Sequence, residues 1–122
     1  MTALLVIIGG AIGAPVRYLT DLYVRDRLGG SFPWGTLVVN VVGAFVLGLV
    51  AGAASATALP QWALTLVGTG FCGALTTFST FSYETVRLAE AGNWRSACGN
   101  VVISLAGGLA AVALGWLAGS AL

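Results

Sequence analysis

Charged residues are scarce in this sequence. Only 7% of its 122 residues are Asp, Glu, Lys or Arg, whereas 58% are hydrophobic. A water-soluble domain carries about 25% charged residues, because its surface must stay hydrated. Most of this protein's surface therefore faces something other than water, and the composition favours membrane lipid. The net charge of +1 also excludes the basic face that nucleic-acid binding requires.

Histidine is absent and cysteine is rare, which limits the available chemistry. The two cysteines, Cys72 and Cys98, are too few for a structural zinc site, and their apolar surroundings predict small buried side chains. With no histidine, no paired membrane carboxylates and no activated nucleophile, we do not expect an enzyme. No Lys or Arg precedes the first apolar run, which is not typical of a secretory signal peptide.

The charges form two short clusters separated by long uncharged stretches. The clusters occupy residues 17–27 and 84–95, and residues 28–83 between them carry no charge. A membrane-spanning helix needs about 20 apolar residues, so this middle stretch is long enough for two crossings with a break at 54–60. The sequence predicts an all-α integral membrane protein, a single four-helix domain over 1–122. Its helices are expected at residues 3–23, 34–54, 61–89 and 97–118.

Four crossings place both termini on one side of the membrane. The loops after the first and third helices lie on the other side, and with their flanks they hold Arg25, Arg27, Arg87 and Arg95. The positive-inside rule then predicts external termini in a multi-pass membrane protein.

Small residues recur at helical spacing in the expected spans. The run GGAIG at 9–13 and the pair Gly48 and Gly52 let another helix approach closely. Trp34 and Trp62 are typical of anchors at the headgroup level.

The third helix is unusual. Its centre, GTGFCGALTTFSTF at 68–81, is rich in glycine and hydroxyl residues, which are poor material for a continuous helix. We predict a break near 73–77, at mid-membrane. Broken backbone is tolerated inside a membrane only where protein or a water-filled cavity satisfies it, and such breaks commonly serve as ion sites.

Each polar group in so apolar a chain has two interpretations. Arg17 is either a functional charge at membrane depth, or a side chain that snorkels and pairs with Asp21. Asn40 is either a helix–helix contact or an anion-coordinating donor. Phe78 and Phe81 share one helix face, where they either pack or line a path for a small anion with their positive ring edges.

The run GFCGALTTFSTF at 70–81 resembles the core motif of the CrcB/Fluc family of fluoride channels. So do GTLVVNVVG at 35–43 and GGAIGAPVRY at 9–18, and the length and four-helix plan are similar over essentially the whole chain. The resemblance implies a dual-topology dimer of antiparallel four-helix subunits, with two narrow pores along their interface. It implies passive export of fluoride down its electrochemical gradient.

The resemblance also implies roles for residues at matching positions. Asn40 would donate its amide hydrogens to fluoride, and the ring edges of Phe78 and Phe81 would face the ion. Ser104 would supply a hydroxyl of a polar track on the fourth helix, together with Asn100, which lies one turn earlier on the same face. The other pore candidates are Thr36, Thr77, Ser79 and Thr80.

Two further roles follow from the same resemblance. Arg17 would lie at the base of a vestibule and attract anions. The backbone carbonyls of Gly73 and Thr76 would hold a structural sodium ion (Na+), shared between the two subunits and not transported.

Two features depart from the family pattern. Family members often have a tyrosine where this chain has Asn100. A subunit that inserts in both orientations should also show little arginine asymmetry, yet four arginines lie on one side and none on the other. The partner is therefore either a second copy, in an antiparallel homodimer, or an oppositely oriented paralogous subunit.

Two other functions compete with a channel. A small multidrug exporter has a similar length but needs a buried carboxylate, and the first helix has none before Asp21, while Glu84 lies near the end of the third helix. A non-conducting assembly subunit fits the glycine patterns but gives the run TTFSTF at 76–81 no purpose.

Overall fold

The computed structural model describes residues 1–56 and 59–122, and every regular element in these ranges is helical. The elements are α1 (Thr2–Leu28), α2 (Trp34–Ser55), α3 (Gln61–Ala63), the π-helical segment η1 (Leu64–Cys72), α4 (Gly73–Leu75), α5 (Phe78–Glu90) and α6 (Trp94–Ser120). Four stretches are long and apolar enough to cross a membrane: Thr2–Leu28, Trp34–Ser55, Gln61–Glu90 and Trp94–Ser120. The chain is a multi-pass membrane protein, as its composition predicts.

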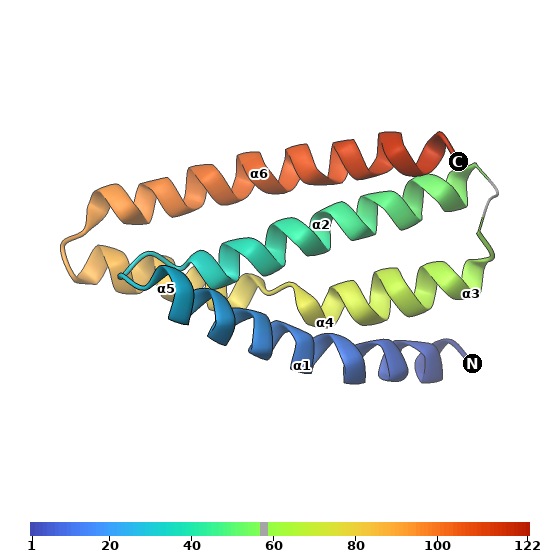
Figure 1. The fold of residues 1–122 in the computed structure, drawn as a ribbon, viewed down its shortest axis with the longest axis horizontal. Coiled ribbons are helices and arrows are strands. Elements are labelled where there is room, and N and C mark those ends of the chain that lie inside the picture. Colours follow the sequence, from blue (N-terminus) through green and yellow to red (C-terminus); the bar gives the residue numbers. More distant parts are fainter. Residues whose placement is uncertain (57–58) are drawn as a thin grey trace.

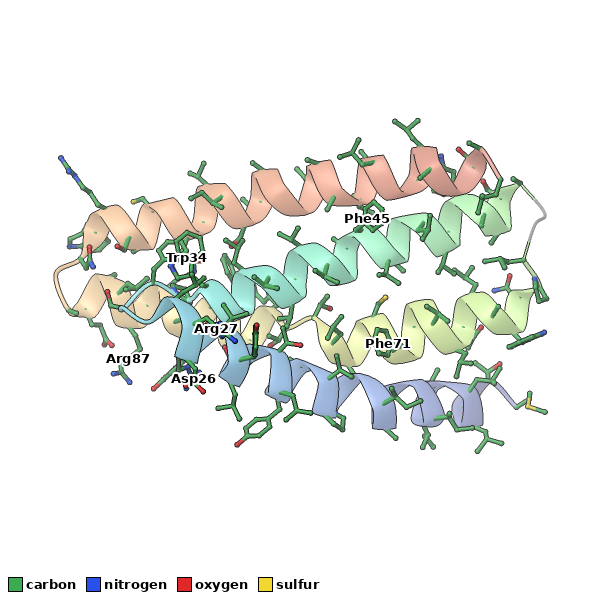
Figure 2. The ribbon with its side chains drawn as sticks, in the orientation of Figure 1. Asp26, Arg27, Trp34, Phe45, Phe71 and Arg87 are labelled. Carbon is green, nitrogen blue, oxygen red and sulfur yellow. The ribbon has the colours of Figure 1, made fainter. Side chains whose placement is uncertain are left out.

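The four spans form two pairs (Figure 1). The helices α2 and α6 lie side by side and run in the same direction, while α1 and the third span run the opposite way. Both termini lie at one end of the bundle, and the loops at 29–33 and 91–93 lie at the other. Figure 2 shows Asp26, Arg27 and Arg87 at the end where these loops lie. The charged clusters therefore share one end of the protein.

Glycines on both helices allow α2 and α6 to pack closely. A Cβ atom on Gly48 would lie 2.2 Å from the carbonyl oxygen of Val112, and one on Gly115 would lie 2.3 Å from that of Phe45. Gly52 and Gly119 make equally close approaches one turn further on. Backbone meets backbone along this contact, which dispersion and close packing stabilise within lipid. The small-residue pattern predicted at Gly48 and Gly52 is confirmed, and its counterpart on α6 completes it.

A second glycine contact joins α1 to η1. A Cβ atom on Gly9 would lie 2.3 Å from the carbonyl oxygen of Leu66, and one on Gly13 would lie 2.4 Å from that of Phe71. The GGAIG run thus allows the close approach expected of it. The structure adds that the facing segment is π-helical over Leu64–Cys72, which the sequence did not predict.

Helix ends differ from the predicted bounds for local reasons. The helix α1 continues to Leu28, past the predicted end at 23, and an ion pair from Arg25 to Asp21 one turn earlier supports the extra turn. It stops at Gly29, whose φ of 61° is a conformation that glycine adopts at no steric cost. The helix α6 begins at Trp94, before the predicted start at 97, because the Asn93 side chain accepts from the Ser96 amide as an N-cap.

Two smaller expectations have mixed outcomes. Cys72 is buried, but the prediction that Cys98 is also buried is wrong, because its side chain lies on the exposed face of α6. The predicted break at 54–60 includes residues 57 and 58, which lie outside the described residues.

Candidate ion-binding site

Two residues of the third span are not helical. The helix α4 ends at Leu75, Thr76 is extended with φ −82° and ψ 159°, and Thr77 is extended with φ −152° and ψ 122°. The helix α5 then begins at Phe78. The Thr77 hydroxyl oxygen caps α5 by accepting from the Thr80 amide at 3.1 Å. Backbone groups near this junction therefore need partners from outside their own helices.

Asn40 of α2 supplies those partners. Its Nδ2 donates to the Thr77 carbonyl at 3.1 Å, and its Oδ1 accepts from the Thr77 amide at 2.8 Å. One side-chain amide thus satisfies both backbone groups of one extended residue. Because Nδ2 carries two hydrogens, one remains for another acceptor. Asn40 therefore joins α2 to the third span, and within the described residues one of its amide hydrogens has no acceptor.

An open cavity of about 270 Å³ lies beside this junction. The Phe78 and Phe81 rings are in contact there, with centroids 5.8 Å apart and planes tilted by 43°. Phe78 is 78% exposed on the surface of the chain. None of the lining residues is charged; they are Asn40, Thr76, Thr77, Phe78, Phe81, Ser104 and Leu105. The structure therefore brings six predicted site residues from three spans to one uncharged cavity: Asn40, Thr76, Thr77, Phe78, Phe81 and Ser104.

A second cavity, of about 160 Å³, neighbours the first, and Thr77 lines both. Three more predicted site residues meet there, Arg17, Thr36 and Thr80. Its remaining lining residues are Tyr18, Asp21 and Val39. Two charged side chains, Arg17 and Asp21, thus line this cavity, while the other is neutral.

The pairing of Arg17 with Asp21 is not what the structure shows. Asp21 instead pairs with Arg25, which lies one turn later on α1, with N to O at 2.5 Å. Arg17 has no hydrogen-bond or ion-pair partner within residues 1–56 and 59–122. Its half-buried guanidinium is left to face the second cavity.

Two predicted residues make contacts of other kinds. Thr36 is 4% exposed, and its hydroxyl donates to Glu84 Oε1 at 2.5 Å, which ties α2 to α5. Ser79 is exposed and lines neither of the two cavities beside Thr77.

Asn100 lies behind the cavity wall. It is 1% exposed, accepts from the Ser104 hydroxyl at 3.3 Å and donates to Thr85 Oγ1 at 2.9 Å. The Thr85 hydroxyl in turn donates to the Phe81 carbonyl at 2.8 Å. The shared face of Asn100 and Ser104 is confirmed, but sequence reasoning missed Thr85. The only local signal for Thr85 is its position one turn after Phe81.

The residues expected to hold sodium offer hard oxygen donors. The Thr77 amide, which a continuous helix would direct at the Gly73 carbonyl, donates to Asn40 instead. A Cβ on Gly73 would meet nothing within 4 Å, so the backbone here is open to approach. Carbonyls at a helix C-terminus carry partial negative charge, and unwound carbonyls are the groups that coordinate Na+ in transporters. Gly73 and Thr76 therefore fit a monovalent cation.

The fold and the site together define a class. A multi-pass helical membrane protein, whose third span loses its helix beside an uncharged cavity, has the construction of channels and transporters. Residues 4–116 match the family described as CrcB-like protein, Camphor Resistance (CrcB), and the chain belongs to that family.

Three relatives are similar over nearly the full chain. The "Fluoride-specific ion channel FluC 1" of Frankia casuarinae is 56% identical over 120 residues, covering 94% of this chain and 93% of the relative. Its namesake in Streptomyces avermitilis is 53% identical, with 97% and 96% covered. The protein of the same name in Thermobifida fusca is 48% identical, with 97% and 95% covered.

Proposed function

We propose that this chain is a subunit of a fluoride-selective ion channel, not an enzyme, which lets fluoride leave the cell passively. The observation that carries the proposal is the larger cavity, which we call the Asn40 cavity. The Asn40 amide, the Ser104 hydroxyl and the rings of Phe78 and Phe81 meet there, and no charged side chain of the described residues lines it. The relatives named as fluoride-specific ion channels support the choice of ion.

The cavity suits a small anion because fluoride holds its water tightly. A pore that passes it must replace that water with other donors, and conduction also requires that the ion can leave. The free amide hydrogen of Asn40 and the positive edges of Phe78 and Phe81 are neutral donors of this kind. Arg17 lines the second cavity and not the one at the rings. Asp21 also lines the second cavity but is paired with Arg25, so Arg17, which is unpaired within the described residues, would attract anions there without fixing them at the rings.

The membrane potential supplies the driving force. One elementary charge is worth about 2.3 kcal/mol per 100 mV. At about 1.4 kcal/mol per tenfold ratio, a cell interior that is negative by this amount sustains an outward anion gradient of roughly 50-fold. A passive channel in the plasma membrane then suffices to lower cytoplasmic fluoride.

We infer that two subunits assemble antiparallel and form two pores, with Thr76 and Thr77 at mid-membrane. The cavity at Asn40 is open, and Phe78 on its wall is 78% exposed, so a second subunit would close it. A sodium ion held by the Gly73 and Thr76 carbonyls would join the subunits as a structural ion. It would neutralise the C-terminal end of α4, and membrane lipid would cover the other apolar faces.

The partner is a second copy of this chain or an oppositely oriented paralogous subunit. The charged residues share one end of the bundle, so the positive-inside rule favours one orientation for a single chain. An antiparallel partner of the same sequence would insert against that preference, whereas a paralogue with the opposite charge bias would not.

Fluoride efflux from liposomes that hold the purified chain alone tests the proposed function. Flux from the lone chain supports a homodimeric channel. Flux that appears only with an oppositely biased family member supports the paired assembly. Vesicles that stay tight to fluoride in both cases, with protein shown to be folded and inserted, contradict the channel.

Changing Phe81→Ile should slow fluoride flux about two- to tenfold, which is the range that an aromatic electrostatic contact represents. The substitution keeps an apolar side chain on the wall but removes the ring edge. A matched control is Phe45→Ile, which changes an exposed ring on α2 and should leave flux unchanged. The measurement is liposome efflux, with size-exclusion chromatography for assembly. If Phe81→Ile fails to fold, the Phe81 ring serves packing and not the ion path.

A further inference from the structure

Three hydrogen bonds connect the cavity wall to the backbone of α5. The first runs from the Ser104 hydroxyl to Asn100 Oδ1 at 3.3 Å, and the second from Asn100 Nδ2 to Thr85 Oγ1 at 2.9 Å. The third runs from the Thr85 hydroxyl to the Phe81 carbonyl at 2.8 Å. We call this row of side chains the Thr85 relay. Of its side chains, Ser104 lines the Asn40 cavity, whereas Asn100 and Thr85 do not.

The direction of the relay is fixed at its backbone end. A carbonyl oxygen can only accept, so Thr85 donates its single hydroxyl hydrogen to the Phe81 carbonyl. The Thr85 oxygen must therefore accept from Asn100. The amide nitrogen of Asn100 therefore faces Thr85, and its carbonyl oxygen faces Ser104. Ser104 must then donate to Asn100, because that oxygen has no hydrogen to give.

This direction gives Ser104 the wrong polarity for an anion. Its only hydrogen is turned toward Asn100, and the cavity is offered oxygen lone pairs. An anion gains from Ser104 only after the hydroxyl rotates and gives up its bond to Asn100. That bond, at 3.3 Å, is the longest of the three and the weakest link of the relay.

We propose that Thr85 is a positioning residue that acts through Asn100 to turn the Ser104 hydroxyl away from the cavity. This inference rests on the proposed function, and it concerns a residue that never touches the ion. If the Thr85 hydroxyl is removed, Asn100 is free to present its amide nitrogen to Ser104. Ser104 then accepts from Asn100 and has its own hydrogen available for the anion.

Thr85→Val removes the hydroxyl while keeping the branched shape of the side chain. Fluoride efflux should rise about two- to tenfold, the range that one hydrogen bond of ordinary net strength represents. Thr85→Ser restores the hydroxyl and should return efflux to the original rate. The matched control is Thr65→Val, because the Thr65 hydroxyl also donates to the carbonyl four residues earlier, that of Gln61 at 3.2 Å. Efflux in this control should not change.

A double-mutant cycle identifies Ser104 as the point of action. With Ser104→Ala in place there is no hydroxyl to turn, so adding Thr85→Val should have no further effect on efflux. An equal effect of Thr85→Val with and without Ser104 would overturn the proposal, and so would unchanged efflux in Thr85→Val alone. Either result leaves fluoride conduction by the original chain intact as the proposed function.

Thermal unfolding in detergent tests the relay independently of conduction. It compares the original chain, Thr85→Val, Ser104→Ala and the double variant. The shifts caused by Thr85→Val and Ser104→Ala should be non-additive, because both side chains act on Asn100. Additive shifts would contradict the relay even if the chain conducts. Non-additive shifts in a chain that carries no fluoride would keep the relay and reject the channel.

Discussion

Changing Asn40→Asp should abolish fluoride flux. An ionised aspartate has no hydrogen to donate, so the bond to the Thr77 carbonyl would be lost and two oxygens would face each other. The new negative charge would also lie on the wall of the cavity. Two like charges about 4 Å apart repel by about 4 kcal/mol at an intermediate dielectric constant, which is about a thousandfold in rate.

The matched control for this charge change is Asn93→Asp. Asn93 caps α6 by accepting from the Ser96 amide at 3.4 Å, and aspartate is an equally good N-cap. The control introduces the same charge far from the cavity, so efflux and thermal stability should both stay close to the original. Normal efflux in Asn40→Asp would remove Asn40 from the ion path and leave it only its contact with Thr77.

Gly115→Ala should strongly destabilise the fold. The added methyl group would lie 2.3 Å from the Phe45 carbonyl oxygen and 2.8 Å from the Leu49 amide nitrogen, which are backbone atoms and cannot rotate away. Overpacking costs about 1–3 kcal/mol. At about 4 °C per kcal/mol, the thermal unfolding midpoint in detergent should fall by up to about 10 °C. Circular dichroism on heating measures this shift.

Gly108→Ala on the same helix is the control. A Cβ atom there would meet nothing within 4 Å, and alanine favours a helix over glycine. Its unfolding midpoint should be unchanged or slightly higher. Equal losses at both positions would mean that α6 tolerates no added methyl group at all, so the close contact with α2 would not be the cause.

The spans and the glycine contacts can be read from the sequence because they depend on local pattern. About 20 apolar residues between charged clusters suffice to predict a crossing, whatever surrounds it. The spacing of Gly48 and Gly52 likewise predicts a close contact, but not that α6 fills it. Ordinary spacing also brings Phe78 and Phe81 together, with ring centroids 5.8 Å apart.

What the sequence could not supply depends on partners that are distant along the chain. The bond between Asn40 and Thr77 joins residues 37 positions apart, and nothing near Asn40 specifies it. Arg17 and Arg25 are each four residues from Asp21, so spacing alone could not choose between them. Asn100 has Ser104 one turn away on its own helix, but its second partner, Thr85, lies on α5.

The sharing of one end by both termini has a practical consequence for anyone who purifies the protein. Within residues 1–122 that end holds no Asp, Glu, Lys or Arg side chain, so a charged affinity tag would add charge where this sequence has none. A lysine- or arginine-rich tag at residue 1 or 122 would oppose the natural bias, and charges added at a C-terminus can invert a membrane protein. A neutral, cleavable tag preserves the orientation that the chain itself encodes.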